Sequence, residues 1–330
     1  MRLRRVSPAM PGWRRLRRGR GFSFVDEHGD ALAPCDVDRV KALVIPPAWT
    51  DVWICPVPNG HLQAAGTDDA GRRQYLYHPD WRVKRDREKF EHMEQFARAL
   101  VRRRRDVRQD LRGDGFETTR VCAAVFSLLD LGTFRIGSDR YADDDGGHGL
   151  TTLERSHVRI ADGVAHFRYV AKAGQQVDVS VRDAQVVAVL AGLRRRRGVD
   201  DRLLAHRVGR RWHALGPQDV NDYIRERLVG EYTAKDFRTW RANVVAAWSL
   251  SESDASSAAS RRRAVAQTMR TVSEHLGNTA AVARSSYVDP RIVDLFEDGI
   301  TVAGTYRPPR PGAAVNRTLE RSVIRLLRRA

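Results

Sequence analysis

Lysine is rare in this basic chain, and its rarity draws attention to the few positions that carry an ammonium group. Only five of the 58 Lys and Arg residues are lysines, at positions 41, 84, 89, 172 and 235. Lys172 falls in a predicted hairpin turn. Lys235 precedes Arg238 by three residues on a predicted helix, so Lys235 and Arg238 share one helix face. The arginine preference suits bidentate contact with phosphate groups. It fits a GC-rich genome equally well, and the count alone leaves both explanations open.

Several familiar kinds of site are missing from the sequence. There is no GxxxxGK[ST] phosphate loop, no GxGxxG after a predicted strand and no HExxH helix. Cys35, Cys55 and Cys122 form no CxxC pair, which argues against a disulfide framework or structural zinc and predicts buried, reduced thiols. The run Asp143-Asp144-Asp145 points its carboxylates in different directions and predicts a solvated loop. We expect no metal site and no cofactor.

The charge balance predicts a polyanionic partner. The 330 residues include 41 Asp and Glu against 58 Lys and Arg, which gives a formal net charge of +17. Hydrophobic residues make up 42% of the chain, enough for one or two packed cores. No apolar run reaches the roughly 18–20 residues of a membrane span, and no secretory apolar segment begins the chain. We expect a cytoplasmic, nucleoid-associated protein that makes no membrane contact.

Composition divides the chain into three parts. Residues 1–20 hold eight arginines without sustained periodicity and predict a flexible basic arm. Residues 21–88 contain short β-prone stretches between Pro and Gly turns, which predicts a small β-rich domain. From residue 89 to 330 helical periodicity dominates. The β-prone stretches are Ala42–Ile45, Val52–Val57 and Gln74–Tyr77.

A three-stranded antiparallel insert interrupts the helical part. Apolar and polar residues alternate in three stretches separated by turns at residues 161–163 and 172–174. Thr119–Leu131 has the spacing of a buried helix, with Gly132 placed as its C-terminal cap. The fold class that follows is α+β, with a β-rich N-terminal domain and a mainly α-helical domain. Further helices are predicted at Glu88–Arg104, Pro217–Val229, Ala234–Leu250, Ser260–Leu276, Arg291–Glu297 and Thr318–Arg328.

At several points the residues match the pattern of one family. They resemble the catalytic domain of type IB DNA topoisomerases of the poxvirus and bacterial branch, and they keep the order Arg, Lys, Arg, Tyr. The small domain also resembles its counterpart in that family, and the likeness covers residues 21–300. The matching segments are Ile45–Trp49, Gly71–Tyr77, Phe134–Gly137, Tyr141, Gly149–Leu153, His157-Val158, Lys172, Lys235–Trp240 and Ser285–Tyr287.

The resemblance implies metal-free cleavage and resealing of one DNA strand. Tyr287 would attack a phosphodiester and hold the 3′-phosphate, and strand rotation would then relax supercoils without ATP. The phosphorane-like transition state concentrates charge on the non-bridging oxygens, which Arg135 and Arg238 would stabilise. Lys172 would protonate the leaving 5′-oxygen, which otherwise departs as a high-pKa alkoxide.

The chain departs from the family pattern at one catalytic position. Relatives carry a histidine nine residues before the nucleophile, where this chain has Asn278. An amide N–H still donates a hydrogen bond but lacks the charge of an imidazolium. We therefore expect catalysis to be retained, with a weaker dependence on low pH.

Other positions are expected to contact DNA. The resemblance implies a phosphate or base contact for Tyr141, and for Lys235 either a second proton donation or a phosphate contact. In the small domain, Tyr75 and Tyr77 would share one strand face and Gln74 would lie on the other. Gln could read adenine edges and Tyr could contact phosphate, although aromatic strand residues are also ordinary core.

Two alternatives remain open at the level of sequence. A tyrosine recombinase uses nearly the same residues, but its second Arg box normally carries His where this chain has Lys235, and its N-terminal domain is usually helical. A catalytically inactive duplex-DNA-binding module would explain the basicity and Asn278. The expected protein is a monomer that clamps duplex DNA between its two domains and needs no protein partner.

Overall fold

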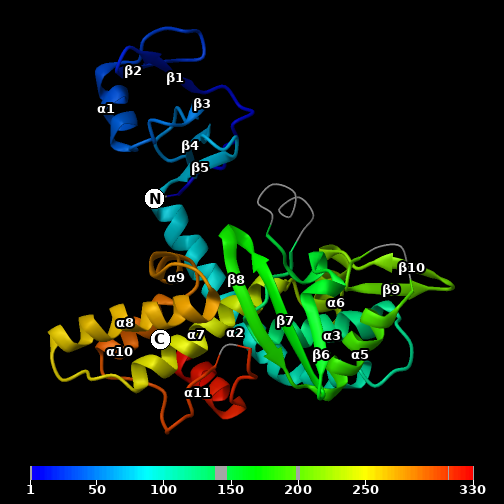
Figure 1. The fold of residues 1–330 in the computed structure, drawn as a ribbon. Coiled ribbons are helices and arrows are strands. Elements are labelled where there is room, and N and C mark those ends of the chain that lie inside the picture. The colour runs from blue at the N-terminus through cyan, green and yellow to red at the C-terminus, as the bar shows by residue number, and fades with distance from the viewer. Residues whose placement is uncertain (1, 138–146, 198–200, 311, 330) are drawn as a thin grey trace. The chain divides into compact units, whose positions relative to one another are not determined.

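Figure 1 shows the computed structural model of the chain, which describes residues 2–137, 147–197, 201–310 and 312–329. Its internal contacts divide it into two compact units, Met1–Glu91 and His92–Ala330. The division falls inside the long helix α2 (Pro79–Asp110). Each unit has its own core and is described by itself.

The first unit is an antiparallel five-stranded sheet with one helix. The strand order is β2-β1-β3-β4-β5. Its core consists of Val40, Val52, Ile54 and Ala64, with Trp13 and Trp49 packed against them. The predicted β-rich domain is confirmed. The elements are β1 (Trp13–Arg18), β2 (Gly21–Val25), α1 (Pro34–Ala42), β3 (Thr50–Ile54), β4 (Leu62–Thr67) and β5 (Arg73–Tyr77).

The expected flexible arm is wrong, because strand β1 pairs with both β2 and β3 and, nearer the start of the chain, Arg4 forms a bridge with Gly60. Arg15 lies on the same strand face as Trp13 and is half-buried, and burial lowers its pKa. Its guanidinium donates to the carbonyls of Ile45, Pro46 and Trp49. An arginine therefore occupies an inward-facing position of β1, and the alternation of apolar and polar residues that would identify the strand is absent.

Residues 42–45 are not a strand, contrary to prediction. Ala42 is the last residue of α1, whose single buried residue is Val40, and residues 43–45 follow the helix. A helix with so little buried surface leaves no apolar stripe in the sequence, so the apolar residues at its end have the composition of a β-prone stretch.

The second unit contains the predicted three-stranded antiparallel sheet, in the order β6-β7-β8. Its strands are β6 (Val158–Ala161), β7 (Val164–Ala171) and β8 (Gln175–Val181). One face of β7 and β8 is buried, and α5 packs on the sheet at β6 and β7 (Figure 1). Both turns lie where the sequence places them. Lys172–Gly174 forms the tip between β7 and β8, with Ala173 and Gly174 at φ of 62° and 72°.

Helices make up most of the rest of this unit and share one hydrophobic core with the sheet. The predicted helices are confirmed within a few residues, except that α2 extends well beyond both predicted ends. The hairpin β9–β10 and helices α5 and α9 were not predicted. The elements are α3 (Thr118–Asp130), η1 (Leu150–Thr152), η2 (Arg155–His157), α5 (Ala184–Arg195), β9 (Ala205–Val208), β10 (Arg211–Ala214), α6 (Pro217–Leu228), α7 (Ala234–Ser251), α8 (Ala258–Leu276), α9 (Ala280–Ser286), α10 (Pro290–Glu297) and α11 (Arg317–Leu327).

The cysteines are all free thiols, but only two of them are buried. Cys55 and Cys122 lie in the cores, and burial raises the pKa of Cys122 to about 12. Cys35 is exposed at the start of α1, so the prediction of three buried thiols is wrong for this residue. Among the described residues, no helix is long and apolar enough to span a membrane.

Candidate active site

Arg238 is buried in helix α7 and lies beside the ring of Tyr287. The residue is 4% exposed, and its guanidinium carbon is 5.9 Å from the centre of the Tyr287 ring. Nη1 donates to the carbonyl of Thr133 at 3.0 Å, and Nη2 donates to the carbonyl of Leu276 at 2.5 Å. Burial, followed by the charge of Arg135, lowers the pKa of Arg238 to about 10, while the Tyr287 phenol acts in the opposite direction. A fixed guanidinium is thus held against a phenol.

Arg135 approaches the same place from the segment that follows α3. Its Nη2 donates to the carbonyl of Gly277 at 2.7 Å and to Oε1 of Gln175 at 3.4 Å. Arg238 donates to the carbonyl of Leu276, the residue before Gly277, so the two cations are neighbours. Helix α7, the segment after α3 and the strand β8 thus supply groups to one cluster. Two guanidinium groups so arranged form a strong site for a phosphate oxyanion.

The C-terminal end of helix α8 holds both arginines. The last carbonyls of a helix have no partner within it and carry partial negative charge, so they attract cations. Helix α8 ends at Leu276 because Gly277 adopts the left-handed conformation, with φ of 58°. A Cβ on Gly277 would lie 1.5 Å from Nε2 of Gln175. Glycine is therefore required here both by the backbone and by the approach of β8.

Two buried donors in this cluster have no hydrogen-bond partner among the described residues. They are Nε of Arg238 and Nδ2 of Asn278; the Oδ1 of Asn278 likewise accepts from no donor. The Asn278 backbone N–H is satisfied by the carbonyl of Ser273. Buried polar groups are nearly always paired, so unpaired ones require an explanation. Both donors are available to a bound anion.

Tyr287 lies at the C-terminal end of α9 and is partly buried against the core. Its backbone is fixed from both sides. The Tyr287 N–H donates to the carbonyl of Ala283, and two residues later the Asp289 N–H donates to Oδ1 of Asn243 at 2.7 Å. Asn243 also donates to the carbonyl of Thr239 on α7. The nucleophile candidate is therefore tied to the helix that carries Arg238.

Lys172 is exposed at the tip of the β7–β8 hairpin, three residues before Gln175. The chain passes close over this tip. A Cβ on Gly147 would lie 2.7 Å from the Lys172 backbone, and the His148 N–H donates to the carbonyl of Val170 at 2.8 Å. The hairpin thus brings the lysine to the edge of the sheet that contacts Arg135.

The remaining predicted residues of the second unit are less closely placed. Lys235 is exposed in the first turn of α7, one turn before the buried Arg238. Tyr141 and the run Asp143-Asp144-Asp145 lie outside the described residues. Within the described part of the chain, no group of three or more His, Cys, Asp or Glu side chains could hold a metal ion.

In the first unit, Tyr75 and Tyr77 form an exposed aromatic pair on strand β5. They are 45% and 39% exposed, and their rings lie 6.3 Å apart with 29° between the planes. Gln74 lies on the opposite face of the strand, where its Nε2 donates to Asp68 at 2.8 Å. The predicted alternation is therefore confirmed. Two exposed tyrosines on one strand face suit contact with a partner.

Sequence reasoning missed several residues that shape the cluster, namely Thr133, Tyr169, Gln175 and Asn243. Tyr169 lies on the buried face of β7, and burial raises its pKa to about 12 while Arg238 and Arg135 pull it down. Strand alternation predicts Tyr169 as a core residue, and it is one, but the alternation does not indicate that Tyr169 also lies near the two arginines. Thr133 and Gln175 act on distant residues, and local patterns carry no signal of such contacts.

Comparison with known proteins agrees with this geometry. Residues 78–300 match the family model described as the catalytic core of eukaryotic DNA topoisomerase I, which is more than half of the chain. Residues 21–68 match the model of the N-terminal domain of bacterial DNA topoisomerase IB. The chain is also similar to the DNA topoisomerase 1B of Acanthamoeba polyphaga mimivirus, with 27% identity over 281 residues that cover 82% of this chain and 83% of the relative. These matches include the cluster of arginines and Tyr287, and the chain therefore belongs to the type IB DNA topoisomerase family.

Proposed function

We propose that this enzyme relaxes supercoiled duplex DNA by cutting and resealing one strand through Tyr287. The observation that carries the proposal is the unpartnered, buried Nε–H of Arg238 beside the Tyr287 ring, together with the unpartnered amide of Asn278 just after the end of α8. Two of the five guanidinium N–H groups of Arg238 serve backbone carbonyls and the side chain also hydrogen-bonds Tyr287, while the Nε–H has no partner and is available to a ligand. A phosphodiester oxygen is the acceptor that matches this charge.

In the cleavage step, the phenolic oxygen of Tyr287 attacks the phosphorus and releases its proton to solvent. The bond between phosphorus and the 5′-oxygen breaks, and Lys172 gives a proton to that oxygen. The 3′-phosphate is then joined to Tyr287. Arg135 and Arg238 stabilise the charge on the non-bridging oxygens, and Asn278 donates a neutral hydrogen bond.

The cut strand then rotates about the intact strand, and the 5′-hydroxyl attacks the phosphotyrosine to reseal the break. The bond energy stays in the phosphotyrosyl link, so the cycle needs no ATP. We expect it to proceed without metal or cofactor, because the arginines supply the charge that a metal ion would otherwise provide. The protein acts as a monomer, with DNA contacts from Lys235, Tyr141 and the Gln74–Tyr77 strand.

The test is relaxation of negatively supercoiled plasmid in excess EDTA without ATP. The wild type is compared with Tyr287→Phe and with Tyr232→Phe, which makes the same change at a tyrosine packed on His92 and Phe96. We expect the wild type and Tyr232→Phe to relax the plasmid and to form a covalent adduct at a 3′-phosphate. Tyr287→Phe should bind DNA with neither activity.

The same experiment separates the rival functions. A binding-only protein would show no relaxation by any variant and equal DNA binding by all. A recombinase would require its own site and would leave the plasmid unrelaxed, although family membership and the β-rich first unit favour the topoisomerase. Relaxation by Tyr287→Phe would refute the proposed nucleophile.

A further inference from the structure

The segment between α10 and α11 contacts the elements that carry the candidate active site. Within this segment, we call residues 302–310 and 312–315 the C-terminal strap. The family match to the catalytic core ends at residue 300, so the strap lies beyond it. Nevertheless it contacts each of the three segments that supply the arginines and Asn278.

Three hydrogen bonds make these contacts. The Gly312 N–H donates to Oγ1 of Thr133 at 2.8 Å. Nη2 of Arg241 donates to the carbonyl of Arg310 at 2.7 Å. Nε2 of His275 lies 2.8 Å from the carbonyl of Pro309. Thr133 precedes Arg135 by two residues, Arg241 follows Arg238 by one helical turn, and His275 precedes Asn278 by three residues.

Thr133 is the most direct of the three links because it has a partner at each end. Its hydroxyl accepts from the strap, and its carbonyl accepts from Nη1 of Arg238 at 3.0 Å. Moving the strap would therefore move an acceptor that fixes the guanidinium. The neighbouring Gly132 packs on Arg241, since a Cβ there would lie 2.4 Å from Cγ of that side chain. Arg241 is 2% exposed, so it is held between this turn and the strap.

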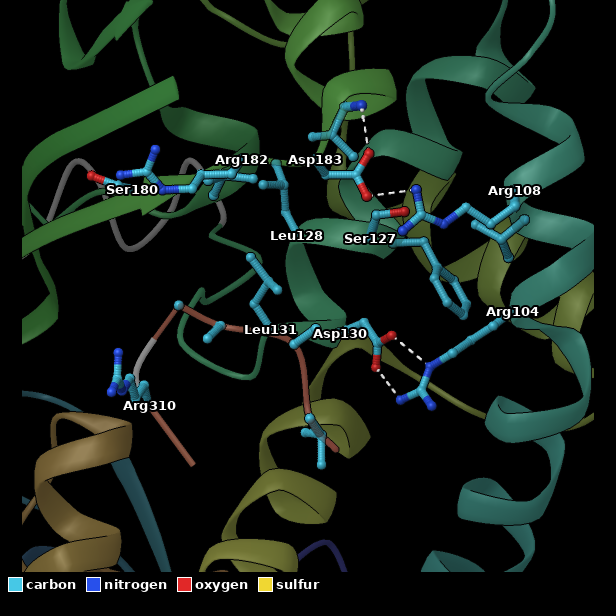
Figure 2. Close-up of a pocket in the computed structure, with 18 of the residues that line it drawn as sticks. Arg104, Arg108, Ser127, Leu128, Asp130, Leu131, Ser180, Arg182, Asp183 and Arg310 are labelled. Carbon is cyan, nitrogen blue, oxygen red and sulfur yellow. Dashed lines mark hydrogen bonds and ion pairs between the residues drawn. The ribbon is translucent and has the colours of Figure 1, made fainter. Parts of the chain in front are cut away.

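The strap packs on the core at Val302, Tyr306 and Val315, but next to Arg310 it borders a cavity. Figure 2 shows the cavity of about 480 Å³ that Arg310 lines together with Leu128, Leu131 and Asp130 of the α3 end. Strap residues 312–315 line the same cavity. Beside the cavity the strap has less packing, so its hydrogen bonds to Thr133 and Arg241 matter more for its position there. Loss of one hydrogen bond should then displace it.

Beyond the strap, helix α11 anchors the segment in the core. Glu320 is fully buried, accepts from Trp240 Nε1 at 2.9 Å and pairs with Arg104. The guanidinium of Arg104 also pairs with Asp130, a contact drawn in Figure 2. Trp240 lies on α7 between Arg238 and Arg241. The end of the strap is therefore fixed to the same helix that it supports.

From these contacts we propose that the C-terminal strap positions Arg238 for catalysis, with Thr133 and Gly312 as its positioning residues. The proposal rests on the proposed function for its catalytic consequence. Its structural content is independent of turnover: the bond between Gly312 and Thr133 restricts the guanidinium of Arg238. In this role Thr133 acts through Arg238, to which its carbonyl is hydrogen-bonded.

The test perturbs the contact from each side. Thr133→Val removes the hydroxyl at nearly constant shape, and Thr133→Ser restores it. Gly312→Ala moves the strap, because its φ is 71° and a Cβ would lie 2.5 Å from Cγ1 of Val179. Gly299→Ala is the matched control, since it also has positive φ, at 79°, but nothing lies within 4 Å.

The first readout is hydrogen exchange of the Arg238 Nε–H, followed by NMR on protein with ¹⁵N-labelled arginine and assigned by its loss in Arg238→Lys. We expect Thr133→Val and Gly312→Ala to accelerate exchange by about tenfold, as for loss of one positioning hydrogen bond. Thr133→Ser and Gly299→Ala should match the wild type. Wild-type exchange in both folded test variants would overturn the proposal. This measurement needs no cleavage, so it decides the question even if the proposed function fails.

The second readout is single-turnover cleavage at saturating DNA. The two test variants should be slowed about tenfold with unchanged DNA affinity, because misplacing a catalytic group reduces the chemical step. The double variant should be no slower than the slower single variant, since both changes break one contact. Additive effects, or a loss of affinity instead of rate, would refute a positioning role.

Discussion

Arg238 and Arg135 donate hydrogen bonds to the carbonyls of consecutive residues, Leu276 and Gly277, at the end of helix α8. One helix terminus thus sets the separation of two guanidinium groups that come from distant parts of the chain. The arrangement offsets part of their mutual repulsion before any phosphate binds. It also explains why Gly277 must end the helix, because continued helix would use these carbonyls internally.

The fork geometry of Arg238 makes lysine a poor substitute. An ammonium group cannot reach the carbonyls of Thr133 and Leu276 together and still face a phosphate. We expect Arg238→Lys to slow cleavage by about 100- to 1,000-fold, as for loss of a preorganised transition-state donor. DNA affinity should change little because the residue is buried. Rapid-quench measurement of single-turnover cleavage checks this.

The matched control for that variant is Arg270→Lys, an exposed position on α8 whose partner is Gln267. It should cleave at the wild-type rate. If the cleavage rate of Arg238→Lys were within about threefold of the wild-type rate, Arg238 would not be a main stabiliser of the transition state.

The exposed tyrosine pair of β5 should affect binding and leave the chemical step unchanged. We expect Tyr75→Ala and Tyr77→Ala each to weaken DNA affinity by about tenfold, which is typical when an aromatic contact with nucleic acid is lost. The cleavage rate at saturating DNA should stay at the wild-type value. Titration of labelled duplex and single-turnover kinetics separate the two quantities. A reduced rate with unchanged affinity would show that these tyrosines do not act as a binding surface.

The sequence predicts the sheet of the second unit well because its signals are local. Alternation in β7 and β8 and the glycines of the turns lie within a few residues of one another. The same local reasoning does not predict strand β1. Arg15 faces inward and donates to carbonyls 30 or more residues away, so the local sequence resembles a solvated tail.

The candidate site shows a similar limit. Arg135, Arg238 and Tyr287 could be predicted from a family pattern, because their chemistry restricts the residue type. Gln175 and Asn243 could not. Each makes a specific contact over a long sequence distance, and many residues could occupy such positions without a local pattern.

The turn before β5 should make the first unit sensitive to acid. The carboxylate of Asp68 accepts from the backbone N–H and the side chain of Arg72 and from Gln74, and these bonds lower the pKa of Asp68 to about 2. The folded pKa lies below the ordinary value of 3.8, so this stabilisation is complete above that value and is lost as the pH falls through 2. A ¹³C NMR titration of the Asp68 carboxyl should show this midpoint. Arg72→Ala should raise it, and Arg18→Ala on β1 should leave it unchanged.

Asn278 offers the sharpest test of how the site handles charge. Because an amide does not titrate, we expect Asn278 to contribute no pH dependence to the wild-type cleavage rate between pH 5 and 8. In Asn278→His, an imidazolium would add positive charge to the transition state. The rate should rise by about three- to tenfold as the pH falls through the imidazole pKa.

The position of that rise follows from the surroundings. Burial and the two neighbouring arginines disfavour a further cation, so the imidazole should titrate below the ordinary value of about 6.5. Single-turnover rates from pH 5 to 8 at constant ionic strength, with Asn278→Gln as the neutral control, give the profile. If Asn278→His gave the same flat profile as Asn278→Gln, the side chain at this position would not face the reacting phosphate. The unpartnered amide would then need another explanation.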